Sequence, residues 1–391
     1  MKKIAVVTGS RAEYGLLKPL IKLIASKDDL ELQLIVTGMH LMPKFGDTYL
    51  QIEEDGFHIT AKIYDDLVGD SSREISRAMG NTMIGFADAL EELEPDIMVV
   101  LGDRSEIFSA VAAALIALIP VAHIHGGETT EGAYDDYLRH AITKMSMFHF
   151  ASTEIYRKRI IQMGENPDKV FNVGAIGIDS IRSLNLMTQE NLEKSLGKKL
   201  LKNSVLITFH PVTLENASAQ NQFGDLLKAL DELKDTTLIF TKPNSDKDGD
   251  IIIKMIDDYV FQNASKAIAF TSLGQLRYLS ALQYVSFVIG NSSSGILEVP
   301  YFKIPTINIG DRQKGRIMPK SVINCKPSYP EILRAIGQAK DDDFLNEIQS
   351  QKNLYGDGHA AEAILDKLES FDSKEMKKPF YDIKDLDFEK P

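Results

Sequence analysis

Ionisable side chains gather directly after two consecutive apolar segments in the first half of the chain. Residues 96–101 and 120–124 are apolar and of strand length, and each is followed by carboxylates, histidines or arginines. These side chains belong to Asp103, Arg104, Glu106, His125, Glu128, Asp135, Asp136, Arg139 and His140. Carboxylates and imidazoles that share a cleft can differ in pKa, so one can act as an acid and another as a base at the same pH. The pattern therefore predicts an acid–base site.

Each of these charges also has a simpler interpretation, as a solvated loop residue or a helix cap. Serine, aspartate and glutamate are favoured at helix starts in any protein. A whole set of them after two neighbouring strands is harder to explain in this way. The carboxyl ends of parallel strands meet at one edge of a sheet, and that edge is where ligands bind. The site interpretation therefore depends on the two segments lying side by side in a parallel sheet.

Strand-like and helix-like segments alternate along the whole chain, which is typical of doubly wound parallel sheets. In the first half the strand segments are residues 4–7, 32–36, 61–64, 96–101, 120–124, 148–152 and 170–174. In the second half they are residues 204–209, 237–240, 267–270, 287–289 and 304–309. Residues 180–203, between the two sets, are polar and carry no strand pattern.

This organisation predicts an α/β fold of two Rossmann-like doubly wound parallel-sheet domains that face a cleft. The first domain is expected at residues 1–182 and the second at residues 183–357. Residues 358–391 are expected to return to the first domain.

Composition narrows the class of protein. The chain has 391 residues and a formal charge of −12, which suits two globular domains and disfavours binding to nucleic acid or to an anionic membrane. Its single cysteine, Cys325, cannot form an intrachain disulfide, and the short apolar run near Met1 does not have the pattern of a signal peptide. No segment has membrane-spanning length, and no zinc-ligand spacing is present. We therefore expect a cytoplasmic protein without a metal.

The second half carries polar residues of its own after its predicted strands. Residues 290–295 read GNSSSG, and the backbone amides and hydroxyls of such small residues can surround an anion at a helix start. Glu298 follows one turn later, where a carboxylate could accept from a ribose diol. Arg312 and Arg316 follow the last predicted strand and suit a diphosphate. The simpler interpretation of residues 290–295 is a serine-rich helix cap.

Three other strand ends add candidates. His210 precedes a proline at a strand end, an unusual place for a purely structural imidazole, and Ser272 lies where backbone groups could pair with a pyrimidine. Residues 8–15 form a small-residue loop before a helix predicted at residues 16–26, a natural cradle for a phosphate or a carbonyl. That loop is not GxGxxG, so a dinucleotide is not indicated. Diphosphate chemistry in one half and acid–base chemistry in the other suit a nucleoside-diphosphate sugar.

With these motifs in view, the chain resembles the UDP-N-acetylglucosamine 2-epimerase family over nearly its whole length. The motifs occur in the family's order at residues 7–15, 36–40, 102–104, 123–128, 135–140 and 290–295. The greatest similarity is to the bacterial hydrolysing type that serves sialic acid synthesis. The resemblance implies two Rossmann-like domains, as in the GT-B class of glycosyltransferases.

The resemblance also implies a reaction that needs no metal or redox cofactor. The sugar C2 proton is removed and UDP is eliminated anti to it, which leaves a 2-acetamidoglucal. Water then adds and releases N-acetylmannosamine.

By position, the resemblance assigns Asp103, Asp135 and Arg139 to the sugar side, with the two aspartates as acid and base candidates. Arg104 is expected near the sugar or its phosphate, and His210 near the diphosphate. The positions that match the UDP site are Arg11, Asn244, Ser292, Ser293, Arg312 and, as ribose acceptor, Glu298. The patterns themselves add His125 and Glu128 as catalytic candidates, and Asp136, Ser272, Ser294 and Gly295 as substrate-binding candidates.

One position departs from the family pattern. Many relatives have a glutamate, thought to be catalytic, where this chain has His125. Either His125 transfers a proton, or Glu128 does so, or this branch does not need the group. A histidine near its intrinsic pKa is a competent general base at neutral pH.

Several alternatives stay open at this stage. The substrate could instead be a UDP-2,4-diacetamido-2,4,6-trideoxyhexose of the legionaminic acid route, because the same motifs would serve it. A glycosyltransferase of the same fold would need an acceptor site, and a nucleotide-sugar sensor would not need so many acid–base groups. The family resemblance implies a UDP-sugar as the partner molecule and a homodimer or homotetramer.

Overall fold

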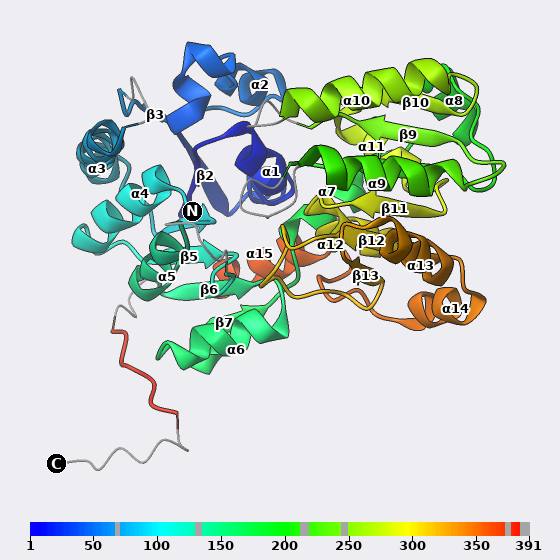
Figure 1. Ribbon diagram of the computed structural model, residues 1–391. Coiled ribbons are helices and arrows are strands. Elements are labelled where there is room, and N and C mark those ends of the chain that lie inside the picture. The colour runs from blue at the N-terminus through cyan, green and yellow to red at the C-terminus, as the bar shows by residue number, and fades with distance from the viewer. Residues whose placement is uncertain (67–70, 130–134, 212–218, 244–248, 372–376, 384–391) are drawn as a thin grey trace. The chain divides into compact units, whose positions relative to one another are not determined.

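The computed structural model describes residues 1–66, 71–129, 135–211, 219–243, 249–371 and 377–383 (Figure 1). The chain forms two compact units. Unit 1 comprises Met1–Ser183 and Tyr355–Pro391, and unit 2 comprises Leu184–Leu354. Within the described ranges, no helix is both long and apolar enough to cross a bilayer.

Unit 1 is built on a parallel sheet in the order β3-β2-β1-β4-β5-β6-β7. Its strands are β1 (Lys2–Thr8), β2 (Leu30–Thr37), β3 (Ala61–Ile63), β4 (Ile97–Leu101), β5 (Val121–Ile124), β6 (Phe148–Ala151) and β7 (Val170–Asn172). The order reverses between β1 and β4. Ligands of such sheets bind outside the carboxyl ends of the strands at this switch point. The loops that follow β1 and β4 are therefore the first place to look for a site.

Helices cover both faces of the unit 1 sheet. The α-helices are α1 (Arg11–Ala25), α2 (Tyr49–Glu54), α3 (Ser72–Leu93), α4 (Ser105–Ile116), α5 (Asp135–Met145), α6 (Glu154–Gln162), α7 (Ile176–Ser183) and α15 (Ala360–Ser370). The 3₁₀ turns are η1 (Gly38–Leu41), η2 (Pro43–Phe45) and η3 (Pro167–Lys169).

Residues 4–7 of strand β1 are all apolar because the strand packs against a core on each face of the sheet. Ile4 and Val6 pack in one core with α1 and α15, whereas Ala5 and Val7 pack in the other core with α3 and α4. Successive strand residues point to opposite faces, so a strand that is covered on both sides must be apolar at every position.

Helix α15 is held in unit 1 by hydrogen bonds to a charged side chain at each of its ends. The carboxylate of Asp179, on α7, accepts from the backbone N–H groups of Ala360 and Ala361 at 3.1 and 2.7 Å. At the other end, Lys2 Nζ donates to the carbonyl oxygens of Leu368 and Phe371 at 3.0 and 2.7 Å. An anion at the N-terminus and a cation at the C-terminus both interact favourably with the helix dipole and stabilise the helix.

The last described segment also contacts unit 1. Lys378 Nζ donates to the carbonyl oxygens of Lys144 and Ser146 at 2.7 and 2.6 Å, and it lies 2.7 Å from the buried carboxylate of Glu165. The ammonium group thereby places three oxygen acceptors around a largely sequestered charge. The backbone N–H of Tyr381 also donates to the carbonyl oxygen of Gly164 at 2.9 Å, so residues 377–383 are attached to unit 1 at more than one point.

Unit 2 repeats the plan with strand order β10-β9-β8-β11-β12-β13. Its strands are β8 (Val205–Thr208), β9 (Leu238–Thr241), β10 (Ala267–Phe270), β11 (Phe287–Gly290), β12 (Thr306–Ile309) and β13 (Val322–Cys325). Its helices are α8 (Gln189–Leu196), α9 (Ala219–Asp231), α10 (Gly249–Gln262), α11 (Gly274–Ala281), α12 (Ser294–Leu297), η4 (Val299–Phe302), α13 (Tyr329–Ala339) and α14 (Asp342–Ser350). The switch point lies between β8 and β11. The predicted fold class, two doubly wound parallel sheets, is confirmed.

Two details of the predicted elements are wrong. The prediction of five strands in the second half omitted β13, an edge strand in which Asn324 is exposed and interrupts the apolar pattern. The predicted loop at residues 8–15 is too long, because α1 begins at Arg11 with Ser10 as its N-cap. Ser10 accepts from the N–H of Glu13, so residues 11–15 belong to the first turns of the helix.

Gly290 is a position where only glycine fits. Its φ is +144°, and a Cβ placed there would lie 1.8 Å from the carbonyl oxygen of Thr208 on the neighbouring strand. The close approach of β8 and β11 at the switch point therefore requires the first glycine of residues 290–295.

We predict that Gly290→Ala lowers the free energy of unfolding by on the order of 3 kcal/mol, because backbone atoms cannot move away as a flexible side chain could. Gly337→Ala is the matched control. Gly337 is exposed on α13 and a Cβ there meets nothing within 4 Å. That variant should gain about 0.5–1 kcal/mol. Urea unfolding of both variants measures the difference, and equal stabilities would contradict the assigned role of Gly290.

Candidate active site

The carboxyl edge of the unit 1 sheet gathers predicted site residues around one ion pair. Asp103 follows β4 after Gly102, whose φ is +80°, and its carboxylate accepts a hydrogen bond from Nη2 of Arg139 on α5. Both side chains are largely buried. Burial raises the pKa of Asp103, Arg139 opposes that rise, and the nearby carboxylates of Asp135 and Glu128 add to it. The structure thus brings together Asp103, Glu128, Asp135 and Arg139, which sequence spacing had grouped.

His125 is fixed in one tautomer. Its φ is +64°, and its backbone N–H donates to Phe150 at 2.9 Å. Ring Nε2 accepts from the N–H of Ile176 at 3.3 Å, so the neutral ring carries its proton on Nδ1, which lies 3.6 Å from Glu128 Oε1. Burial lowers the pKa of His125, and the Glu128 carboxylate opposes this. In this arrangement the lone pair of His125 is occupied by a backbone amide.

Glu128 is held on the same side of the site. Its Oε1 accepts from the hydroxyl of Ser152 at 2.7 Å, in addition to facing the Nδ1–H of His125. These contacts bear on the open choice between His125 and Glu128 as the group that transfers a proton. Glu128 offers a carboxylate that accepts a hydrogen bond from Ser152 and that the His125 ring faces at 3.6 Å.

His123 supports the loop that carries Asp103. Its ring is fully buried, with Nε2 2.7 Å from the carbonyl oxygen of Gly102 and Nδ1 3.2 Å from Thr143 Oγ1. Burial lowers the pKa of His123 to about 3, so the ring is neutral at physiological pH. A neutral imidazole with two partners is a structural brace.

Two buried glutamates lie next to Arg104. Glu106 belongs to the predicted set of ionisable residues, whereas Glu13 was not singled out. Glu106 Oε1 accepts from Arg104 Nε at 2.5 Å, and Glu13 Oε1 lies 3.9 Å from the same nitrogen. Glu13 Oε2 accepts from the N–H of Gly9 at 2.7 Å. Glu13 is 7% exposed and Glu106 5%. Burial raises the pKa of Glu13 to about 7, the charge of Glu106 adds to the rise, and Arg104 opposes it.

A local signal for Glu13 was present in the sequence. Ser10 and Glu13 have the spacing of a capping box, which places a glutamate in the first turn of a helix. Two glycines accommodate the buried carboxylate of Glu106. A Cβ on Gly9 or Gly38 would lie 2.7 or 2.9 Å from Glu106 Oε1, so both positions leave room for that carboxylate.

The remaining predicted residues of unit 1 lie at the margins of this cluster. Asp136 is 4.0 Å from Arg139 Nη1 and 3.7 Å from His140 Nε2 on the same helix. Arg11 is exposed at the start of α1. Among the described residues, no group of three or more His, Cys, Asp or Glu side chains has an arrangement that could hold a metal ion.

In unit 2, Asn291 organises the switch point. Its Oδ1 accepts from the N–H of His210 at 2.7 Å, and its Nδ2 donates to the carbonyl oxygen of His210 at 2.8 Å. Its own carbonyl oxygen accepts from Arg312 Nη1 at 3.1 Å and from Gln313 Nε2 at 2.9 Å. One asparagine therefore joins His210 to Arg312, two residues that are far apart in sequence and were predicted separately.

The three serines of residues 290–295 differ in their surroundings. Ser292 and Ser293 are partly buried beside α12, and the hydroxyl of Ser294 donates to Oε2 of Glu298. Helix α12 has only four residues, so the predicted contribution of a helix dipole at this point is small. Gly295 lacks a side chain for a packing reason, because a Cβ there would lie 2.6 Å from Thr306 Cγ2.

Two more predicted positions complete the survey. The hydroxyl of Ser272 accepts from the N–H of Gly274 at 3.1 Å, at the exposed start of α11. Asn244 lies outside the described residues.

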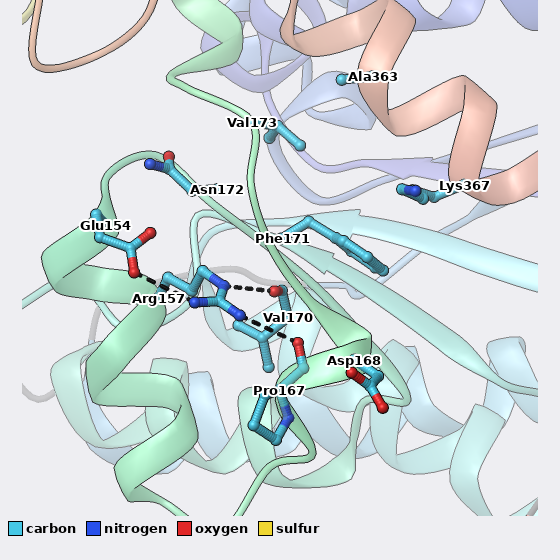
Figure 2. Close-up of a pocket in the computed structure, with 10 residues that line it drawn as sticks. All are labelled: Glu154, Arg157, Pro167, Asp168, Val170, Phe171, Asn172, Val173, Ala363 and Lys367. Atoms are coloured by element: carbon cyan, nitrogen blue, oxygen red, sulfur yellow. Dashed lines mark hydrogen bonds and ion pairs between the residues drawn. The ribbon is translucent and has the colours of Figure 1, made fainter.

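A hollow at the β7 edge of unit 1 is a different feature (Figure 2). Its lining comes from α6, η3, β7 and α15, and none of the predicted site residues contributes to it. Arg157 crosses it and donates to the carbonyl oxygens of Val170 and Pro167 at 2.8 and 3.3 Å, while Glu154 lies 3.2 Å away. The guanidinium is thereby used to join η3 and β7 to α6.

The raised pKa of Glu13 leads to a pH-dependent stability. The folded chain binds this proton more tightly than the unfolded chain, in which the pKa is near 4.5. The contribution of Glu13 is therefore full below about pH 4.5 and is lost as the pH rises through about 7. We predict that wild type loses about 2 kcal/mol relative to Glu13→Gln between pH 5 and pH 8.

Urea unfolding at several pH values measures this loss. The exposed Glu54 provides the control, because Glu54→Gln should follow wild type at every pH. Curves for wild type and Glu13→Gln that stay parallel would show that Glu13 does not retain its proton.

Known proteins resemble the chain in sequence and in fold. It is 46% identical to a GDP/UDP-N,N'-diacetylbacillosamine 2-epimerase (hydrolyzing) of Campylobacter jejuni, over 83% of this chain and 84% of that one. It is 40% identical to polysialic acid biosynthesis protein P7 of Escherichia coli, over 98% of both. A UDP-N-acetylglucosamine 2-epimerase of Neisseria meningitidis is 35% identical over 87% and 88%.

Solved structures show the same fold at low identity. The UDP-GlcNAc 2-epimerase from Neisseria meningitidis bound to UDP-GlcNAc matches with a TM-score of 0.76 at 19% identity, over 94% of this chain and 100% of that one. The family model for UDP-N-acetylglucosamine 2-epimerase matches residues 22–369. The resemblance inferred from the sequence is therefore confirmed, and the chain belongs to the UDP-N-acetylglucosamine 2-epimerase family.

Proposed function

We propose that this protein is a hydrolysing UDP-N-acetylglucosamine 2-epimerase, which converts UDP-N-acetylglucosamine and water to N-acetylmannosamine and UDP. The product would supply sialic acid synthesis. The observation that carries the proposal is the cluster of Asp103, Glu128, Asp135 and Arg139 at the carboxyl edge of the unit 1 sheet. Relatives named as hydrolysing 2-epimerases and as a polysialic acid biosynthesis protein support it.

The proposed reaction needs a base and an acid on one sugar ring. A base takes the C2 proton, the C–H electron pair forms the C1–C2 double bond, and the C1–O bond breaks so that UDP leaves with its electron pair. Water then adds its hydroxyl to C1, and a proton returns to C2 on the opposite face. General acid–base groups typically contribute factors of about 10²–10⁴ to such steps.

We assign these roles to the carboxylates of the unit 1 cluster. Asp103 and Asp135 are the acid and base candidates, and Arg139 favours the ionised form of Asp103. Glu128 is the third carboxylate, and His125 and Ser152 orient it. On the nucleotide side we assign His210 and Arg312 to the diphosphate and Glu298 to the ribose. Arg11, Arg104, Asp136, Ser272, Ser292, Ser293, Ser294, Gly295 and Asn244 remain proposed contributors to substrate binding.

A second substrate is favoured by one specific observation. The relative at 46% identity carries the name of a hydrolysing diacetylbacillosamine 2-epimerase. The same acid–base groups would serve a UDP-2,4-diacetamido-2,4,6-trideoxyhexose, since the reacting atoms C1 and C2 are unchanged. The two sugars differ at C4 and C6, so the choice depends on side chains that contact those positions.

Proton NMR in heavy water tests the proposal. We expect that purified protein with UDP-N-acetylglucosamine releases UDP and N-acetylmannosamine that carries deuterium at C2. Formation of UDP-N-acetylmannosamine would mean epimerisation without hydrolysis. Turnover of only the diacetamido sugar would establish the second substrate. UDP binding with no exchange at C2 of either sugar would refute the epimerase reaction and favour a transferase.

We predict that His125→Ala lowers turnover about tenfold or more while UDP binding changes little. The reason is that Glu128 loses the imidazole that faces it at 3.6 Å, and loss of orientation reduces proton transfer more than binding. Steady-state kinetics and calorimetric titration of UDP measure the two effects. His58 is exposed, so His58→Ala is the control and should leave both unchanged. Full turnover of the His125 variant would remove this residue from the mechanism.

A further inference from the structure

A tyrosine, a serine and a glutamate form a hydrogen-bonded chain in unit 2. Tyr278 lies on α11, Ser294 begins α12, and Glu298 follows that helix. The hydroxyl oxygens of Tyr278 and Ser294 are 2.6 Å apart, and the Ser294 hydroxyl donates to Glu298 Oε2. Tyr278 was not among the residues that sequence patterns singled out.

The direction of the two hydrogen bonds follows from the number of protons on each hydroxyl. A serine hydroxyl has one proton, and Ser294 uses it toward the Glu298 carboxylate. The contact between Tyr278 and Ser294 must then use the phenol proton, so Tyr278 is the donor. Burial and the charge of Glu298 both raise the pKa of Tyr278, which keeps the phenol protonated. The chain therefore runs from Tyr278 through Ser294 to Glu298.

The two hydroxyls act against the effect of burial on Glu298. Burial raises the pKa of this carboxyl, and the hydrogen bond from Ser294 lowers it. A hydroxyl that accepts one hydrogen bond becomes a stronger donor, because successive bonds polarise one another. Tyr278 thus strengthens the one hydrogen bond that is found to favour the charged form of Glu298.

Helix α11, which carries Tyr278, is anchored by hydrogen bonds to a neighbouring segment. Ser280, two residues further along, accepts from the N–H of Met187 at 2.9 Å, and Tyr284 donates to the Met187 carbonyl oxygen at 3.1 Å. These contacts fix α11 against the chain segment that precedes α8. The phenol oxygen is thereby presented to Ser294 from a second, separately anchored element.

We propose that Tyr278 is a positioning residue, which acts through Ser294 to hold the Glu298 carboxylate ionised and oriented for a vicinal diol. This inference rests on the proposed function, in which Glu298 accepts from the ribose of UDP. A carboxylate is acceptor-only when ionised, so it suits the two O–H donors of a ribose. A protonated or rotated carboxyl would lose that preference.

Paired calorimetric titrations with UDP and with 2′,3′-dideoxy-UDP test the proposal. We expect wild type to prefer UDP by about tenfold or more, since each hydrogen bond to a charged group contributes to discrimination. In Tyr278→Phe the preference should fall at least threefold, through weaker binding of UDP and unchanged binding of the dideoxy nucleotide. The same selective loss is expected for Ser294→Ala, which keeps the test decisive if the tyrosine variant does not fold.

Tyr329→Phe is the matched control, because it removes a tyrosine hydrogen bond of the same unit, to Glu232 Oε1 at 3.1 Å, that takes no part in holding Tyr278, Ser294 or Glu298. It should retain the full preference for UDP. A preference that persists in Tyr278→Phe and Ser294→Ala, or an equal loss of both nucleotides, would overturn the positioning role alone. Wild type that binds neither nucleotide would refute the UDP site of the proposed function and the inference with it.

Discussion

The hydrogen-bonded ion pair of Arg139 with Asp103 is the interaction on which the unit 1 site depends. It joins α5 to the loop after β4 across 36 residues of sequence. The carboxylates of Glu128 and Asp135 lie close enough to raise the pKa of Asp103, and the guanidinium of Arg139 is the group that favours its ionised form. Removal of one partner of a buried ion pair typically costs about 3–5 kcal/mol, because the other charge is left uncompensated. The stability of this edge of the sheet and the placement of the proposed acid–base groups therefore rely on the same contact.

Burial divides the remaining ionisable groups of this edge into charged and neutral ones. The pKa values of His123 and His125 are lowered by burial, and that of Glu13 is raised. Neutral imidazoles can brace a loop or orient a carboxylate without adding charge, and a protonated Glu13 relieves repulsion from Glu106. The acids of this edge are thus packed around two arginines, and burial raises the pKa of both Glu13 and Asp103.

Unit 2 shows a different feature, the close approach of backbone segments at its switch point. Its switch point is built from a glycine that admits the neighbouring strand, an asparagine that joins two loops, and hydroxyls that hold Glu298. Backbone groups and short side chains dominate there, with Glu298 and Arg312 as the charged members. Both sheets have a switch point, yet carboxylates cluster at that of unit 1 whereas backbone and hydroxyl hydrogen bonds predominate at that of unit 2.

The alternation of apolar strands with helices determined the fold class, since strands that are covered on both faces of a sheet are mostly apolar. Spacing along the chain also placed Asp103 directly after a strand, and Arg139 and Glu298 on the segments that follow β5 and β11. It did not indicate that Glu13 and Glu106 flank Arg104, nor that Tyr278 reaches Ser294. It also missed the edge strand β13, whose exposed Asn324 breaks the pattern.

Patterns of period and spacing are local, so they report which residues share an element or follow a strand. Burial, pKa shifts and hydrogen bonds depend on groups brought together from distant segments. The sequence by itself therefore determined the two-sheet architecture and the chemical types at each strand end. Only the tertiary structure decided which of those groups are charged, which are neutral and which hold the others in place, because desolvation arises when separate elements pack against one another.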